Sequence, residues 1–230
     1  MLELKDICYS PMDEDKIMIP EDEITKKEII KHVSVKIDER FIAVTGPNGS
    51  GKSTLAKLIS GIIRPTSGRI LFDGKDITDY SITERANAGI SYAFQAPVRF
   101  KGLTVKDLIT LAKGRDANPS LDEICDILSQ VGLCARDYVN REVNASLSGG
   151  ELKRIEIAMT IARGTELTIF DEPEAGIDLW SFNNLIRVFE NMYKSIKGSI
   201  IIISHQERIL KIADRIILLD NGKIKKDGTR

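Results

Sequence analysis

A phosphate-binding loop between a predicted strand and a predicted helix constrains this fold most. Its sequence is Gly46-Pro47-Asn48-Gly49-Ser50-Gly51-Lys52-Ser53-Thr54; an apolar run, residues 41–45, precedes it, and apolar residues at helical spacing follow. In this context backbone N–H groups and the helix N-terminus attract an anion. Lys52 is therefore predicted to reach the outer phosphates of a nucleotide, and the Ser53 hydroxyl to hold Mg²⁺. An ordinary glycine turn is the alternative, and the flanking strand and helix count against it.

Two acidic residues at the end of a second apolar strand complement this loop. Asp171 and Glu172 directly follow the apolar run at residues 167–170. Two carboxylates at the tip of an apolar strand need a positive partner, which Mg²⁺ at a phosphate site would supply. Asp171 is predicted to hold the metal, usually through water, and Glu172 to act as general base toward the attacking water. The alternative is a helix-capping acid beside a surface glutamate, and the presence of the phosphate loop upstream argues against it.

Three further polar positions lie at the ends of predicted elements. Gln95 follows the predicted strand at residues 90–94, and His205 ends the buried strand at residues 199–204. Open parallel sheets place ligand-contacting residues at such strand ends. Ser148-Gly149-Gly150-Glu151 opens a predicted helix and is a second potential anion site. Taken alone, that turn favours an ordinary helix N-cap over a ligand site.

The order of the elements predicts an α/β fold with an added antiparallel layer. Residues 2–7 and 33–37 alternate apolar and polar side chains, and residues 69–72 lead into an Asp-Gly turn, as antiparallel strands do. Residues 103–139 have helical periodicity and are predicted to form an insertion, in which Ser120 and Glu123 are predicted to form a capping box at the head of a helix. Asn221-Gly222 is predicted to turn the last strand into a small hairpin with residues 223–225. The segment from Pro11 to Glu28 contains acidic clusters between prolines and is predicted to be a surface loop or an irregular hairpin.

Charge and composition exclude several classes of function. The net charge is −1, from 33 basic and 34 acidic residues, which argues against a nucleic-acid clamp. No run approaches the roughly 20 apolar residues that cross a bilayer, and the N-terminus lacks a signal-peptide pattern. A cytoplasmic protein without membrane insertion is therefore expected. The three cysteines, Cys8, Cys125 and Cys134, form no C-x-x-C pair, which argues against structural zinc. His32 has no motif around it and is predicted to be an ordinary surface or strand-edge residue.

Taken in order, these motifs resemble those of an ATP-binding-cassette (ABC) ATPase. They correspond to the Walker A loop (46–54), the Q-loop (Gln95), the signature motif (147–151), the Walker B strand (170–173), the D-loop (175–178) and the H-loop (204–205). The resemblance covers nearly the whole chain, and other phosphate-loop ATPases lack the signature motif. It implies a single domain, residues 1–230, of the P-loop NTPase class: a RecA-like mixed-sheet core (about 1–95 and 160–230), an antiparallel β layer and an inserted α-helical subdomain (about 96–159).

The resemblance also implies an ATP hydrolase that works as a head-to-tail dimer. The Ser148-Gly149-Gly150-Glu151 motif of one chain would complete the site in trans, with Ser148 and Gly150 near the γ-phosphate held by Lys52 of the other. Gln95 would contact Mg²⁺ and sense the nucleotide, and His205 would contact the γ-phosphate. Asp178 would belong to the D-loop, and Tyr9 stands where the family places an aromatic residue that stacks on adenine.

Four local sequences resemble the SufC family, the ATPases of iron–sulfur cluster assembly. They lie at residues 92–98, 148–157, 174–178 and 204–210. This resemblance implies that ATP-driven closure reshapes a SufB/SufD-like scaffold. Pro173, by contrast, is usual in transporter ATPases, so the alternative is the nucleotide-binding subunit of a membrane transporter, with a permease as its partner. A third possibility is a regulatory module that binds ATP without significant turnover.

Overall fold

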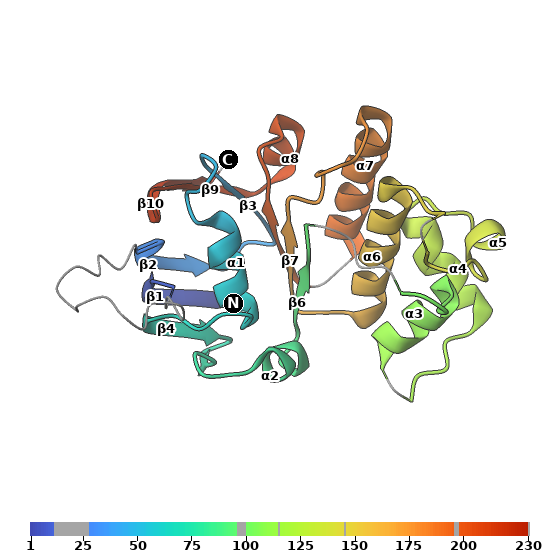
Figure 1. Ribbon diagram of the computed structural model, residues 1–230, viewed down its shortest axis with the longest axis horizontal. Helices are drawn as coiled ribbons and strands as arrows, with labels where there is room; N and C mark the ends of the chain where they lie inside the picture. The colour runs from blue at the N-terminus through green and yellow to red at the C-terminus, as the bar shows by residue number, and fades with distance from the viewer. Residues whose placement is uncertain (12–27, 96–99, 115, 145, 196–197, 230) are drawn as a thin grey trace, which may run out of the picture.

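The computed structural model describes residues 1–11, 28–95, 100–114, 116–144, 146–195 and 198–229. Figure 1 shows a small group of strands on one side, a central sheet, and most of the helices on the other side. The strands are β1 (Leu2–Tyr9), β2 (Ile30–Ile37), β3 (Phe41–Thr45), β4 (Ser67–Phe72), β5 (Lys75–Asp76), β6 (Ile90–Ala93), β7 (Leu167–Asp171), β8 (Ser199–Ile203), β9 (Arg215–Asp220) and β10 (Lys223–Thr229). The helices are α1 (Lys52–Ser60), α2 (Ile82–Asn87), α3 (Val105–Lys113), α4 (Leu121–Gln130), α5 (Ala135–Tyr138), α6 (Gly149–Arg163), α7 (Leu179–Ser195) and α8 (Glu207–Ile212).

The central sheet has six strands in the order β10-β9-β3-β8-β7-β6. Strand β3 pairs in parallel with β8 and β9, and β7 pairs in parallel with β6 and β8, while β10 is antiparallel to β9. The second sheet, β2-β1-β4-β5, is antiparallel. These two sheets confirm the predicted mixed core and antiparallel layer. Because β3, β8 and β7 are neighbours, the loops at their carboxyl ends meet at one edge.

Alternate residues of the central strands face two separate hydrophobic clusters. Ile42 and Val44 of β3 pack with α1 and the antiparallel strands. Phe41 and Ala43 pack on the opposite face, against residues of α3, α4, α6 and α7. Successive side chains of a strand point to opposite faces, so the sheet itself separates the clusters. The helix that follows the phosphate loop, α1, and the helix that follows the Ser-Gly-Gly turn, α6, therefore cover opposite faces (Figure 1).

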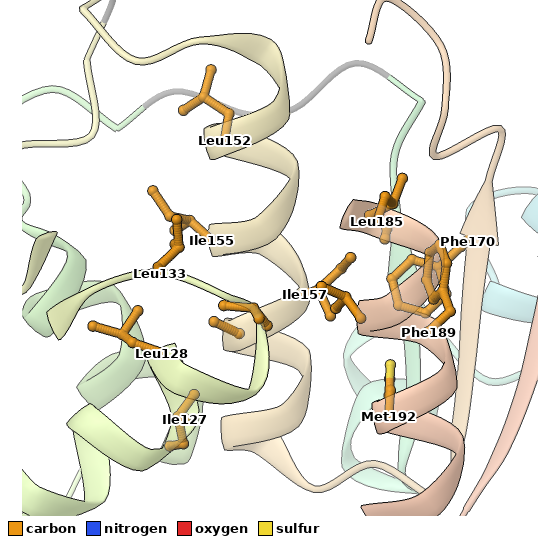
Figure 2. Packing of buried hydrophobic residues seen from close by; sticks show 14 of the residues in the cluster. Ile127, Leu128, Leu133, Leu152, Ile155, Ile157, Phe170, Leu185, Phe189 and Met192 are labelled. Carbon is orange, nitrogen blue, oxygen red and sulfur yellow. The ribbon is translucent and has the colours of Figure 1, made fainter. Parts of the chain in front are cut away.

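Helix α6 lies at the centre of the larger cluster. Figure 2 shows Leu152 and Ile155 on its side toward α4, and Ile157 directed toward Phe170 of β7 and Phe189 of α7. All five side chains are at most 3% exposed. A helix buried on two sides transmits movement between its neighbours, since close-packed interiors deform little. No helix in the described part of the chain is both long and apolar enough to span a bilayer.

Some predicted boundaries differ from the observed elements. The predicted strand at 90–94 ends at Ala93, and β1 and β2 are longer than predicted because they pair with each other up to Tyr9 and Ile30. Ser120 caps α4 by accepting a hydrogen bond from the Glu123 N–H, but the Glu123 carboxylate pairs with Lys113, 10 residues earlier. Only half of the predicted capping box is therefore formed. Helix α6 crosses the predicted subdomain boundary near residue 159, so the limits of that subdomain stay a prediction.

The segment from Pro11 to Glu28 falls largely outside the described residues, which leaves its predicted loop untested. The final turn is as predicted: residues 221–222 connect β9 to β10 as a hairpin, and both have positive φ. Two such residues in succession suit the two-residue hairpin turn, whose twist matches that of its strands.

A fully buried arginine closes the end of helix α1. The guanidinium of Arg85 donates hydrogen bonds to the carbonyl oxygens of Leu58 and Ile59 in the last turn of α1, and to those of Thr78 and Tyr80. The last carbonyls of a helix lack partners within the helix, and a cation suits its negative end. Burial lowers the pKa of Arg85 to about 10, so the side chain keeps its charge at neutral pH.

Replacing Arg85 by methionine is expected to lower the free energy of unfolding by about 2–4 kcal/mol, because several buried carbonyl groups lose their donors. Denaturant unfolding measures this change. The matched control is Arg64→Met, which removes an exposed arginine whose charge lowers the pKa of Arg85. Equal stability of the Arg85 variant and the wild-type chain would show that the buried hydrogen bonds contribute nothing net.

Candidate active site

The phosphate loop holds its lysine in place through its own backbone. Lys52 is buried, and its Nζ donates hydrogen bonds to the carbonyl oxygens of Gly46 at 2.9 Å and Pro47 at 3.0 Å. Gly46 has a φ of 144°, and a Cβ atom there would lie 1.9 Å from the carbonyl oxygen of Leu219. Only glycine fits this close approach. Burial lowers the pKa of Lys52, and the negative charges of Glu172 and Asp171 oppose that shift.

Asp171 ends β7 next to the first turn of α1. Its side chain is buried; Oδ1 accepts a hydrogen bond from Ser53 Oγ at 2.9 Å, and Oδ2 accepts one from the Tyr92 hydroxyl at 2.7 Å. Burial, and then the hydrogen bond to Asp171, raise the pKa of Tyr92, so the hydroxyl remains a donor. The structure thus brings together Ser53 and Asp171, two of the three predicted magnesium ligands; the third is Gln95. Hard oxygen donors of this kind are those that Mg²⁺ prefers.

Glu172 is the centre of a second group at the same edge. Its Oε2 accepts a hydrogen bond from Gln95 Nε2 at 2.7 Å, and its Oε1 lies 3.7 Å from His205 Nε2. Glu172 has a φ of 44°, a left-handed conformation that non-glycine residues rarely adopt. Such strain persists only where surrounding contacts impose it, and it is common at functional sites. All three predicted residues therefore meet, with Gln95 bound to Glu172 and not to Asp171.

Two residues at this edge make contacts that the sequence motifs do not predict. Tyr92 is one, although the parallel pairing of β6 and β7 sets it opposite Ile169, two residues before Asp171. Ser204 is the other: it is fully buried and donates a hydrogen bond to Glu174. Burial raises the pKa of Glu174, and its Oε2 has no hydrogen-bond partner among the described residues. This contact connects the segment after β7 to the residue preceding His205.

The Ser-Gly-Gly-Glu turn forms a complete capping box at the start of α6. Ser148 accepts a hydrogen bond from the Glu151 N–H, and the Glu151 carboxylate accepts one from the Ser148 N–H. Tyr138 and Arg141 also bind the Glu151 carboxylate. Burial opposes ionisation, but these hydrogen bonds and the charge of Arg141 lower the pKa of Glu151 to about 2. The turn is therefore rigid and its glutamate ionised at neutral pH.

The same turn packs against the segment that follows β7, within one chain. A Cβ atom on Gly149 would lie 3.3 Å from the carbonyl oxygen of Gly176, and one on Gly150 would lie 2.9 Å from Cβ of Ser181. Asp178 caps this segment, since its Oδ1 accepts a hydrogen bond from the Ser181 N–H at 3.0 Å. The predicted signature motif and D-loop are thus neighbours, on the face of the sheet opposite to α1.

Lys153, one turn into α6, connects this helix to the strand end that carries Gln95. Its side chain is 1% exposed, and Nζ donates hydrogen bonds of 2.7 Å to the carbonyl oxygen of Phe94 and to Glu156. Burial raises the pKa of Glu156, and the charge of Lys153 opposes that shift. The sequence offered one signal for this residue, a lysine and a glutamate three positions apart on a predicted helix.

Tyr9, the predicted adenine contact, ends β1 and packs partly buried against the smaller cluster. Its carbonyl oxygen accepts a hydrogen bond from the Ile29 N–H at 2.8 Å, which fixes the backbone where β2 begins. Its stacking on a base stays a prediction.

Comparison with known proteins identifies relatives along most of the chain. A family model described as ABC transporter matches residues 30–175. The chain is 43% identical, over 210 residues, to an uncharacterized ABC transporter ATP-binding protein of Methanocaldococcus jannaschii, covering 88% of this chain and 83% of that protein. It is 34% identical, over 211 residues, to an energy-coupling factor transporter ATP-binding protein of Thermotoga maritima, covering 89% and 77%.

Solved structures show the same fold. The dimeric structure of a bacterial ABC transporter cassette aligns with a TM-score of 0.83 at 22% identity, over 100% of this chain and 98% of that one. A post-hydrolysis dimer of the cassette, bound to ADP and phosphate, aligns with a TM-score of 0.82, also at 22% identity. At this level of identity the likeness establishes the fold and leaves the partners open.

Proposed function

The chain belongs to the ABC transporter family of ATP-hydrolysing cassettes, and from this premise we propose that it hydrolyses ATP as a head-to-tail dimer to move a partner protein. The observation that carries the proposal is the grouping of Glu172 with Gln95 and His205 beside the phosphate loop. Phosphoryl transfer requires positioning and charge stabilisation more than covalent chemistry. A strained carboxylate held by an amide and an imidazole is suited to orient a water molecule and accept its proton.

Each residue of the proposed site has a separate task. Lys52 binds the outer phosphates through its charge, and His205 contacts the γ-phosphate from the end of β8. Gln95, which donates a hydrogen bond to Glu172, would help to hold the nucleotide and Mg²⁺ when they bind. Ser53 and Asp171 would hold Mg²⁺, which neutralises phosphate charge when bound. Tyr92 orients the Asp171 carboxylate through its hydroxyl.

The positions of α1 and α6 support a site shared between two chains. The phosphate loop precedes α1 on one face of the sheet, and the Ser148 turn precedes α6 on the other. The sheet therefore separates the two phosphate-binding ends within one chain. A second chain in head-to-tail orientation brings its Ser148 to the first chain's Lys52, which makes hydrolysis depend on closure of the dimer.

Lys153 connects helix α6 to Phe94, the neighbour of Gln95, and replacing Lys153 tests whether this contact couples dimer closure to Gln95. Lys153→Met is expected to lower the rate of ATP hydrolysis about 10-fold with little change in ATP affinity, because Phe94 loses the donor that positions neighbouring Gln95. Steady-state phosphate release and nucleotide titration measure the two effects. Lys106→Met, on an exposed site of α3, is the matched control. If the Lys153 variant hydrolysed ATP at the wild-type rate, this contact would not position Gln95.

For the partner, a membrane permease is the first candidate. The relatives reported above are named as transporter ATP-binding proteins, and Pro173 after the acidic pair is usual in such ATPases. In this role closure of the dimer pushes on a permease near Gln95 and the helices that precede α6. The names of these relatives therefore favour the transporter role, whereas the local sequences favour the SufC-like role.

A SufB/SufD-like scaffold is the second candidate, and helix α6 supports it. Three of the residues that resemble the SufC helix have structural tasks: Tyr138 fixes Glu151, and the buried Lys153 pairs with Glu156. Transporter ATPases more often carry glutamine at the position of Glu151. In this role the protein works in the cytoplasm on a scaffold that builds a metal cluster.

Co-purification distinguishes the two candidates. The tagged chain is expressed in its native host, extracted with and without detergent, and its stoichiometric partner is identified by mass spectrometry. A permease recovered only with detergent supports the transporter role, and a SufB/SufD-like protein recovered without detergent supports the second. ATP hydrolysis is then measured with and without that partner. A rate that stays near zero in both conditions contradicts the proposed function and favours the regulatory module.

A further inference from the structure

We propose that Cys8, Glu28 and His32 form a site for a borderline transition-metal ion, with Zn²⁺ as its expected occupant. One ligand atom from each residue lies within 4.8 Å of those of the other two. Across the described ranges of the chain, no other group of three histidine, cysteine or acidic residues meets this criterion. Thiolate, imidazole and carboxylate are the ligands that Zn²⁺ takes in proteins. The site lies on β1 and at the start of β2, outside the catalytic residues.

The sulfur of Cys8 lies in a buried position next to the backbone of His32. Cys8 is 5% exposed, and its Sγ accepts a hydrogen bond from the His32 backbone N–H at 3.3 Å. A backbone N–H donor therefore already lies against this sulfur, on the side of the chain that carries the His32 side chain. The cysteine therefore offers a buried ligand that solvent does not compete for.

The imidazole of His32 is oriented by a carboxylate. Asp6 Oδ1 lies 2.8 Å from His32 Nδ1, which leaves Nε2 available to donate to a metal. Metal-binding histidines almost always engage such an acceptor through their second ring nitrogen. The His32 side chain is 67% exposed, so an ion can enter from solvent, and a water molecule can take the fourth position.

The backbone of both strands is distorted at this place. Asp6 and His32 each have a φ of 52°, in the left-handed region that non-glycine residues seldom occupy. The pairing of β1 with β2 shifts register between Leu4 and Ile7 and again between Ile7 and Tyr9. Irregularities of this kind redirect side chains and are frequent beside functional sites. Here they bring the side chains of Asp6, Cys8 and His32 together.

Zn²⁺ binding requires the three ligand atoms to move only a short distance toward one another. Zinc ligands at about 2.0–2.3 Å from the ion lie roughly 3.5 Å from one another, so the most distant pair needs to approach by about 1 Å. Glu28 and His32 have rotatable side chains that allow this. The absence of a C-x-x-C pair argued against structural zinc from the sequence, but Cys8 and His32 come from two strands that only the fold pairs, and Glu28 lies just before the second strand.

The site adjoins the phosphate loop through the backbone between its ligands. Between Glu28 and His32, the Lys31 N–H donates a hydrogen bond to the carbonyl oxygen of Gly222, and the Gly222 N–H donates one to Ser50 in the phosphate loop. A Cβ atom on Gly51 would lie 2.7 Å from Ile30. A bound ion would therefore fix the segment that packs on the phosphate loop.

The test uses the full chain and Zn²⁺ alone, without nucleotide. Competition with a chromophoric chelator is expected to give one Zn²⁺ per chain, and Co²⁺ in its place is expected to give a thiolate charge-transfer band. Cys8→Ser should abolish the band, and His32→Gln should weaken Zn²⁺ binding at least about 10-fold, as should Asp6→Asn. Cys134→Ser, at an exposed cysteine on another element, is the matched control and should leave both signals unchanged.

Because His32 is exposed, its variant is expected to fold, and the thermal unfolding temperature without metal verifies this. A stoichiometry below one Zn²⁺ per chain, a Co²⁺ complex without the thiolate band, or unchanged affinity in folded His32→Gln would each overturn the proposal.

Discussion

Replacing Glu172 by glutamine is expected to lower the rate of ATP hydrolysis by at least about 100-fold while ATP still binds. Glutamine keeps the size of the side chain and its hydrogen-bonding capacity toward Gln95 and His205, but it cannot accept the proton of the attacking water. ATP would therefore remain between the two chains, and the dimer would accumulate. Phosphate release measures turnover, nucleotide titration measures binding, and size-exclusion chromatography with ATP measures the dimer.

Glu207→Gln is the matched control for this experiment. Glu207 undergoes the same chemical change two residues after His205, but it is exposed and pairs with Lys211 on α8. It should hydrolyse ATP at the wild-type rate. Near-normal turnover in the Glu172 variant would exclude Glu172 as the general base and would direct the search to His205, the other proton acceptor at this edge.

Mixing two inactive variants, Lys52→Ala and Ser148→Arg, is expected to restore ATP hydrolysis. Each variant alone should lose about 100-fold or more, because charge-assisted hydrogen bonds to phosphate are worth about 1.5–3 kcal/mol each. In a mixed head-to-tail dimer one site combines an intact Lys52 with an intact Ser148. With random pairing and independent sites, the mixture should reach up to about one quarter of the wild-type rate per chain.

A second mixture provides the control. Lys52→Ala and Glu172→Gln both affect the phosphate-loop half of a site, so neither site of their mixed dimer is complete and activity should stay low. Two different purification tags verify that mixed dimers form in both experiments. If Lys52→Ala with Ser148→Arg forms mixed dimers without activity, the site is not shared in this arrangement.

Part of the candidate site could be predicted because its chemistry is local. The phosphate loop needs glycines, a lysine and a serine at fixed spacing between a strand and a helix, and those requirements are met by contiguous residues 41–60. Asp171 and Glu172 could be predicted in the same way. Two carboxylates at the end of an apolar strand need a positive partner, which a phosphate site with its metal ion supplies. The mixed sheet and the final hairpin followed from strand patterns and turn residues.

Other contacts depend on which distant segments pack together. Tyr92 reaches Asp171 because β6 and β7 pair in register. Lys153 reaches the carbonyl oxygen of Phe94, 59 residues away in sequence, because α6 packs against the end of β6. Local periodicity carries no information about such pairings and does not predict that Lys153 is fully buried. The Ser120 capping box failed for the same reason, since Lys113 competes for the Glu123 carboxylate.

The phosphate loop, Gly46 to Thr54, could be predicted from the sequence alone, because a glycine-rich turn at a helix N-terminus is a local arrangement suited to bind phosphate. The tertiary structure decided what surrounds it. It placed α1 and α6 on opposite faces of one sheet, which separates Lys52 from Ser148, and it paired β1 with β2 so that Cys8 meets His32. Both outcomes depend on long-range strand pairing and burial, which only the folded chain specifies.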